Sequence, residues 1–138
     1  MALSKRIGLG NGVVVNYHRV ASVGIVTNVQ TVIEVASYTS KGKRAEEKAW
    51  YEEAALREEL SRKADEDLTE EERAVLATEQ EPMNVYIETK VLSTPYDQGM
   101  TVDRAYAWIK ANVPELEGAA DVLEDGQDAG EGVRNDAV

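Results

Sequence analysis

Hydrophobic and polar residues alternate along the first 38 residues, which is the pattern of β-strands. The clearest alternation runs through residues 13–27, and β-branched residues return at 31–38. With residues 3–9 ahead of them, these stretches predict three consecutive antiparallel strands. The odd positions of the longest stretch form one mostly apolar face, interrupted by Arg19: Val13, Val15, Tyr17, Arg19, Ala21, Val23 and Ile25.

Turn-forming residues separate these predicted strands. Residues 10–12 read Gly-Asn-Gly and contain the Asn-Gly pair that favours a tight hairpin. A second turn is expected near Asn28. Glycine inside a strand weakens regular pairing, so we expect Gly24 to mark a β-bulge.

From residue 43 the pattern changes to that of helices. Residues 43–65 contain no proline and are rich in Ala, Glu, Leu and Arg, which are strong helix formers. Thr69 and Glu72 have the spacing of a capping box, which predicts a second, short helix through about Thr78. The longer helix has only a thin apolar stripe, typical of a helix that projects into solvent or packs on one neighbour: Ala45, Ala49, Leu56 and Leu60, with Trp50 beside them.

The two-residue period returns after Pro82 and predicts a fourth strand. Thr101 is a predicted N-cap for a helix that would lie on the apolar face of the sheet and close the core. Pro114 and Gly118 bracket a last turn. The expected strand face consists of Met83, Val85, Ile87, Thr89 and Val91, and the expected helix face of Val102, Ala105, Tyr106, Ile109 and Val113.

These elements predict an α+β fold, with a small antiparallel sheet of about four strands packed by a C-terminal helix. Residues 1–42 and 82–123 would form the sheet domain, and residues 43–81 an inserted, charged helical hairpin. From residue 124 the chain is mostly Gly, Asp and Glu with little to bury, so residues 124–138 are expected to be a disordered acidic tail.

Charge is sorted along the chain, whose formal net charge is −11. Residues 1–45 carry six basic residues and one acidic residue, whereas residues 46–81 carry fourteen acidic and five basic residues. This balance argues against a nucleic-acid or anionic-membrane partner, because both need a basic surface. The sorting favours attraction within the molecule or between copies, or it reflects the solvated faces of unlike elements.

The residues that are absent exclude several kinds of chemistry. The chain has no cysteine, which rules out disulfides, thiolate catalysis and zinc–thiolate sites. It shows no apolar leader and no apolar run near 18 residues, so we expect neither a signal peptide nor a membrane span. We therefore expect folding in the cytoplasm where the chain is made.

No group of residues has the pattern of a catalytic or metal site. His18 is the one histidine, and without an oriented partner it is expected at the surface or in an interface rather than in catalysis. Neighbouring carboxylates such as Glu46 and Glu47 fit a solvated helix face. Residues 121–126 lack the ligand spacing of an EF-hand, and residues 8–12 fit a hairpin turn better than a phosphate loop. We predict no enzymatic activity, no cofactor and no small-molecule substrate.

Partner binding is the remaining prediction. The chain has no Phe, so its core is poor in large side chains, and exposed strand edges favour a homo-oligomer or a complex with a larger protein. Tyr106 and Trp108 cannot share one helix face, so Trp108 is either an interface anchor or a residue at the edge of the core. Tyr17, His18, Arg19 and Trp108 are the predicted partner-binding residues.

Three segments carry a resemblance to known proteins. Residues 11–20 read NGVVVNYHRV, residues 33–38 read IEVASY, and residues 105–110 read AYAWIK. They resemble a group of small bacteriophage proteins encoded among tail, baseplate and tail-fibre genes, with a Gly-Val-x-x-x-Tyr-His-Arg strand, a second strand ending in Ser-Tyr, and a short C-terminal helix. The likeness covers roughly residues 5–40 and 83–122. The charged stretch 43–81 departs from the shorter linker expected of the group.

The resemblance implies a structural role in the virion, in the tail, the baseplate or the attachment of tail fibres. Its partners would be other virion proteins, and it supplies no catalytic residues. A head decoration or head-fibre protein is an alternative within the same class. A second class is an acidic adaptor or regulatory protein that acts in the infected cell outside the particle.

Overall fold

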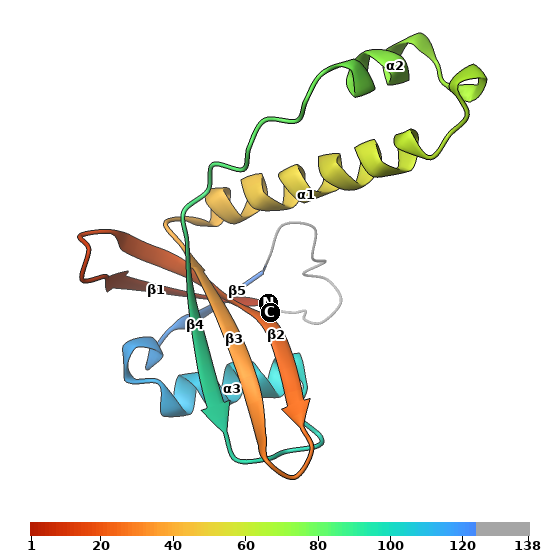
Figure 1. The fold of residues 1–138 in the computed structure, drawn as a ribbon. Helices are drawn as coiled ribbons and strands as arrows, with labels where there is room; N and C mark the ends of the chain where they lie inside the picture. Colours follow the sequence, from red (N-terminus) through yellow and green to blue (C-terminus); the bar gives the residue numbers. More distant parts are fainter. Residues whose placement is uncertain (124–138) are drawn as a thin grey trace. The chain divides into compact units, whose positions relative to one another are not determined.

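The structure is a computed structural model that describes residues 1–123, and it divides into two compact units (Figure 1). The sheet unit comprises residues 1–41 and 86–123, and the helical unit comprises residues 42–85. The expected acidic tail, residues 124–138, lies outside the described residues.

The sheet unit contains an antiparallel sheet whose strands lie in the order β4-β3-β2-β1-β5 (Figure 1). The predicted α+β class is confirmed, but the sheet has five strands and not four. The additional strand is β5, which pairs with Ala2, Leu3 and Ser4 where only a turn was expected. Three residues are too few to show an alternating pattern. The strands are β1 Ala2–Gly8, β2 Val14–Val26, β3 Gln30–Tyr38, β4 Ile87–Thr94 and β5 Ala120–Val122.

Helix α3, Val102–Asn112, covers one face of the sheet with Ala105, Tyr106 and Ile109, as predicted, whereas Val102, expected on the same helix face, is 50% exposed. Thr101 is its N-cap and accepts a hydrogen bond from the amide of Arg104 at 3.2 Å. A short 3-10 turn, η2 (Pro114–Leu116), follows the helix. The core between helix and sheet consists of Leu3, Val20, Ile33, Val35, Ala105, Tyr106, Ile109, Val113, Leu116 and Ala119.

The single apolar face expected for β2 is interrupted by a β-bulge. Val20 pairs with Val35, but the next paired residue of β2 is Ser22, so Ala21 is an extra residue. An extra residue shifts the alternation by one position. Val23 therefore packs against the helix-covered core, and the predicted face is wrong beyond Ala21. Gly24 lies in regular register, so the bulge expected there is also wrong.

The fourth strand lies later in the chain than predicted. Residues 83–86 are not in a strand, and β4 begins at Ile87. Leu92 pairs with Ile33 and packs against the core, whereas Val91 is 62% exposed. Ile87, Thr89 and Val91 share one face as expected, but the core lies against the opposite face, because alternation alone does not say which face of a weakly apolar strand is covered.

Both hairpin turns occur where the sequence places them. Gly12 closes the first with a φ of +89°, and Asn28 lies in the second with a φ of +61°. Glycine and asparagine tolerate this left-handed conformation better than other residues. The side chain of Asn11 also accepts a hydrogen bond from the amide of Val13 at 3.0 Å, which stabilises the first turn.

The helical unit contains two helices and an extended return segment. Helix α1 spans Lys41–Ser61, a 3-10 turn (η1) spans Asp65–Asp67, and α2 spans Glu70–Ala77. The capping box at Thr69 and Glu72 is confirmed, with hydrogen bonds of 3.1 and 2.9 Å. Leu60 is buried but Leu56 is 49% exposed, so the predicted apolar stripe is not one continuous contact face.

Candidate binding surfaces

His18 is buried inside the sheet unit, with 1% of its surface exposed. Its Nε2 lies 2.7 Å from the carbonyl oxygen of Lys5, and its Nδ1 lies 2.7 Å from the hydroxyl of Ser37. A carbonyl can only accept, so Nε2 carries the hydrogen and Nδ1 accepts one from Ser37. The expectation of a surface histidine was wrong. Burial lowers the pKa of His18, and the hydrogen bond to Lys5 opposes that shift.

Tyr17 and Arg19 lie on the opposite face of β2 from His18, beside Tyr38 of β3. Tyr17 and Tyr38 are paired across the strands, and their rings meet edge to face at 6.0 Å. Arg19 donates from Nε to the hydroxyl of Tyr38 at 2.9 Å. The structure therefore groups Tyr17 and Arg19 with Tyr38, and separates them from His18.

Trp108 is partly buried and packs against the core beneath α3. It also lines a surface hollow formed by the loop after β4, with Pro95, Asp97 and Met100. Trp108 therefore lies at the edge of the core. This was one of its two predicted roles, the other being an interface anchor. A partner-binding role for Trp108 or Arg19 stays a prediction.

A groove of about 340 Å³ opens on the helix-covered face of the sheet. We call it the sheet groove. Its apolar lining is Ile7, Leu9, Val15, Val35, Leu92, Val113 and Leu116, and its polar lining residues are His18, Ser37, Glu88, Thr89, Lys90 and Glu115. These residues come from four strands, a hairpin turn and the segment after α3, so no local sequence pattern could have revealed the groove.

Charged residues surround this apolar lining. Glu88, Lys90 and Glu115 line the sheet groove, and Lys90 forms an ion pair with Glu115 at 3.1 Å. The pKa of Glu115 is lowered by a hydrogen bond from its own backbone amide and then by Lys90. Both partners are about half exposed, so the pair contributes little to stability. Its position gives the groove a polar rim.

The outer half of β2 is a free strand edge. Strand β1 pairs with β2 only as far as His18, whereas β3 pairs with β2 as far as Val26. Within residues 1–123, no strand lies beyond β2 from Ala21 onward. We call residues 21–27 the open edge. No residue from Val20 to Ile33 is charged, and Val29 in the adjoining turn is 69% exposed.

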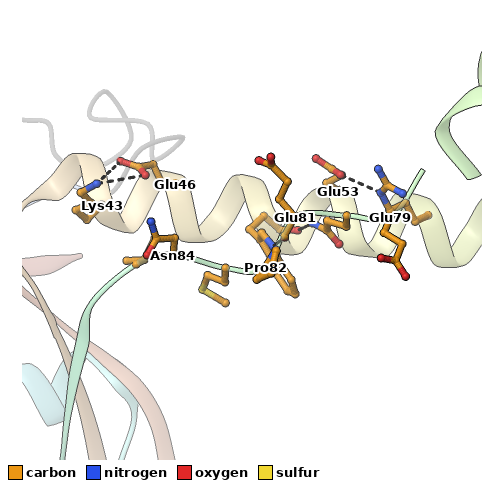
Figure 2. Close-up of a pocket in the computed structure, with 12 residues that line it drawn as sticks. Lys43, Glu46, Glu53, Glu79, Glu81, Pro82 and Asn84 are labelled. Carbon is orange, nitrogen blue, oxygen red and sulfur yellow. Dashed lines mark hydrogen bonds and ion pairs between the residues drawn. The ribbon is translucent and has the colours of Figure 1, made fainter. Parts of the chain in front are cut away.

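The helical unit has a cleft of its own, of about 480 Å³, between α1 and the return segment (Figure 2). Ion pairs lie along it: Lys43 with Glu46 at 3.2 Å, and Arg57 with Glu53 at 2.9 Å. Residues 79–85 form the opposite wall. The cleft is lined mainly by charged and polar groups, so it is unlike the sheet groove.

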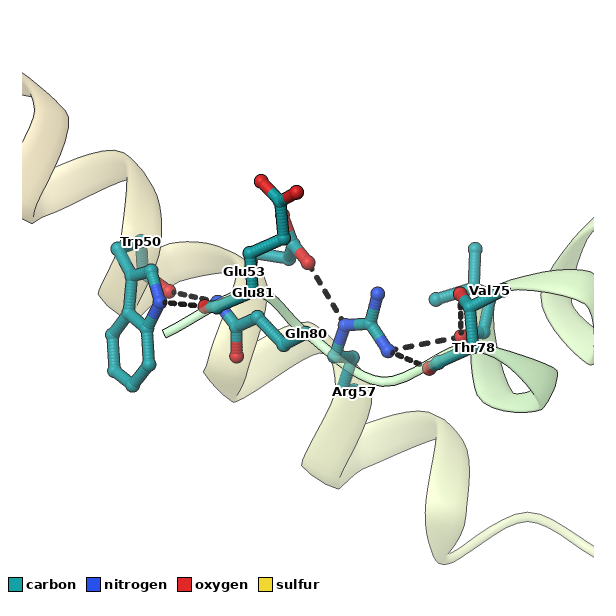
Figure 3. A network of polar contacts seen from close by, with 7 residues as sticks. All are labelled: Trp50, Glu53, Arg57, Val75, Thr78, Gln80 and Glu81. Carbon is teal, nitrogen blue, oxygen red and sulfur yellow. Dashed lines mark hydrogen bonds and ion pairs between the residues drawn. The ribbon is translucent and has the colours of Figure 1, made fainter. Parts of the chain in front are cut away.

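Trp50 holds the return segment to α1, and Arg57 holds the end of α2 to α1 (Figure 3). Trp50 donates from Nε1 to the carbonyl of Glu81 at 2.7 Å, and Gln80 donates back to the carbonyl of Trp50 at 2.8 Å. Arg57 donates to the carbonyls of Val75 and Thr78, at 3.0 and 2.6 Å. These carbonyls end α2, where a cation and a donor are both favourable.

Among residues 1–123, no group of His, Asp and Glu side chains is arranged to hold a metal ion. No helix in the same part of the chain has the length and apolar character needed to cross a membrane. In comparisons with known proteins, no family model, no curated protein and no solved structure matches this chain.

Proposed function

We propose that this chain is a structural protein of a bacteriophage particle that acts by binding other proteins and not by catalysis. Its place would be the tail, the baseplate or the attachment of tail fibres. Support for the phage assignment comes from the resemblance of residues 11–20, 33–38 and 105–110. In the structure these segments contribute to β2, β3 and α3, which all belong to the sheet unit.

The sheet groove is the observation that supports protein binding most directly. Its lining is apolar, and its charged residues Glu88, Lys90 and Glu115 form a rim. Protein interfaces commonly have this arrangement, with an apolar centre from which water is excluded and a polar border. The groove would accept one or two apolar side chains of a virion partner, while the rim sets their orientation.

Two alternative functions, a head protein and a non-virion adaptor, differ in whether the protein is found in purified particles. A head decoration or head-fibre protein would also be part of the particle. A non-virion adaptor is favoured by one observation, the fourteen acidic residues of residues 46–81, which could mimic another acidic surface. An adaptor would be absent from purified particles.

The test is quantitative mass spectrometry of purified particles, with the chain measured relative to the major head and tail proteins. We expect a fixed number of copies per particle that co-purifies with tails. The variant Leu9→Glu places a charge in the sheet groove and is expected to prevent incorporation. Val91→Glu, on the exposed part of β4, is the matched control and is expected to incorporate normally. Absence of the wild-type chain from particles would overturn the proposal.

A further inference from the structure

Edge strands usually carry features that prevent pairing with another chain, and the open edge differs from the edge strand β4 in this respect. Strand β4 contains Glu88 and Lys90 and is followed by Pro95. Charges and proline are common protective features of edge strands. The open edge, residues 21–27, has neither. Its one irregularity is the bulge at Ala21, and the residues that follow pair with β3 in unbroken register from Ser22 to Val26.

The backbone of the open edge is also accessible. Gly24 is exposed, and a Cβ atom added to it would meet nothing within 4 Å. A glycine within a strand often marks a place where a second backbone approaches closely. Ile25 and Val26 beside it are large apolar residues that are exposed in this structure.

We propose that the open edge pairs with the open edge of a second copy of this chain, which joins two sheets into one continuous sheet. This inference rests on the proposed function, since it names one of the partners of an assembly protein. Two identical strands can pair antiparallel about a twofold axis, because each then presents the same edge to the other.

The side chains of the open edge are compatible with this symmetry. With the axis at Gly24, Val23 of each copy lies opposite Ile25 of the other copy, and Ser22 lies opposite Val26. Val23 packs against the core, so the Val23–Ile25 pairs would extend the apolar layer from one copy into the next. Apolar pairs of this kind across antiparallel strands are stabilising.

The absence of charged residues at the open edge favours a second copy of this chain as its partner. Two copies with a net charge of −11 repel each other, and acidic residues are spread over most of the chain. The fourteen residues from Val20 to Ile33 carry no charge, so two chains can meet there without placing like charges in contact. Repulsion between the more distant acidic residues is screened beyond about 10 Å at ordinary ionic strength.

The experiment is sedimentation velocity of the full chain over a range of concentrations, with hydrogen exchange measured in parallel. We expect a monomer–dimer equilibrium and a gain of amide protection in residues 21–27 as the concentration rises. The double variant Ser22→Lys/Gly24→Lys is expected to weaken dimerisation by about tenfold or more. Both positions are exposed, so the variant is expected to fold.

The matched control is Thr89→Lys/Ser93→Lys, which adds the same charges to exposed positions of the edge strand β4. It is expected to dimerise like the wild type. A chain that stays monomeric, a control that weakens the dimer equally, or protection gained outside residues 21–27 would each overturn the proposal. Hydrogen exchange of the wild-type chain tests the pairing of residues 21–27 even if a variant fails to fold.

The two proposals fail in different ways. If the chain is monomeric but is found in purified particles, the proposed edge pairing is refuted and the proposed virion role is not. If the chain dimerises through residues 21–27 but is absent from particles, the proposed edge pairing stands and the proposed virion role is refuted.

Discussion

The side-chain hydroxyl of Tyr106 accepts a hydrogen bond from the backbone amide of Val20 at 2.8 Å. The same hydroxyl donates to the carbonyl of Met1 at 2.6 Å. Val20 is the last regularly paired residue of β2 before the bulge at Ala21. One buried side chain of α3 therefore ties together the start of β1 and the irregular point of β2, and it satisfies polar groups that burial would otherwise leave without partners.

We expect Tyr106→Phe to destabilise the sheet unit by about 1–3 kcal/mol, because it leaves the buried amide of Val20 without this acceptor. Urea unfolding followed by circular dichroism gives the change in the free energy of unfolding. Tyr96→Phe is the matched control, since the hydroxyl of Tyr96 bonds to the exposed side chain of Gln98 and to no other group within residues 1–123. Equal effects of the two variants would show that the hydrogen bonds of Tyr106 contribute no stability of their own.

Local sequence patterns were sufficient to predict much of this fold. The hairpin at Gly12, the N-cap at Thr101 and the capping box at Thr69 each depend on residues close together in the chain, and each is present. Strand β5 and the bulge at Ala21 depend on pairing with distant residues, which alternation does not record.

The candidate surfaces were harder to predict for the same reason. His18 was expected at the surface because its two partners, Lys5 and Ser37, become visible only when β1, β2 and β3 are aligned. The sheet groove combines residues from Ile7 to Leu116. The open edge depends on where β1 stops pairing with β2, and the composition of β2 does not record that point.

The buried position of His18 makes the stability of the sheet unit depend on pH. Its pKa in the folded chain is below the ordinary value of 6.5. As the pH falls through 6.5, the unfolded chain binds a proton that the folded chain takes up only at lower pH. The free energy of unfolding therefore decreases as the pH is lowered through that range, and this contribution stops changing below the folded pKa.

A proton NMR titration measures this directly, because the chain has a single histidine. We expect the ring protons of His18 to titrate below pH 6.5 in the folded chain. We also expect the difference in unfolding free energy between wild type and His18→Asn to shrink as the pH falls, since the acidic residues are common to both proteins. Titration at or above 6.5 would contradict the assignment.

The sheet unit is expected to fold without the helical unit. Tyr38 at the end of β3 pairs with Ile87 at the start of β4, so a short turn can replace the residues between these strands. Removal of residues 43–81, with the ends joined by a short glycine-containing turn, is expected to leave a cooperative thermal transition. Loss of that transition would show that the helical residues belong to the folding core of the sheet unit.

The attachment of α2 to α1 in the helical unit depends more on the hydrogen bonds of Arg57 than on the burial of apolar side chains. Arg57 donates to the carbonyls of Val75 and Thr78 and pairs with Glu53, whereas few large apolar side chains in this unit are buried. Arg57→Met keeps much of the aliphatic side chain but removes these donors. Because hydrogen bonds from a charged group contribute about 1.5–3 kcal/mol, we expect the amides of α2 to exchange at least about tenfold faster with solvent. Arg62→Met is the matched control, since Arg62 lies just after α1, is highly exposed and pairs with the nearby Glu58. Equal protection of α2 in the two variants would mean that Arg57 does not hold α2 to α1.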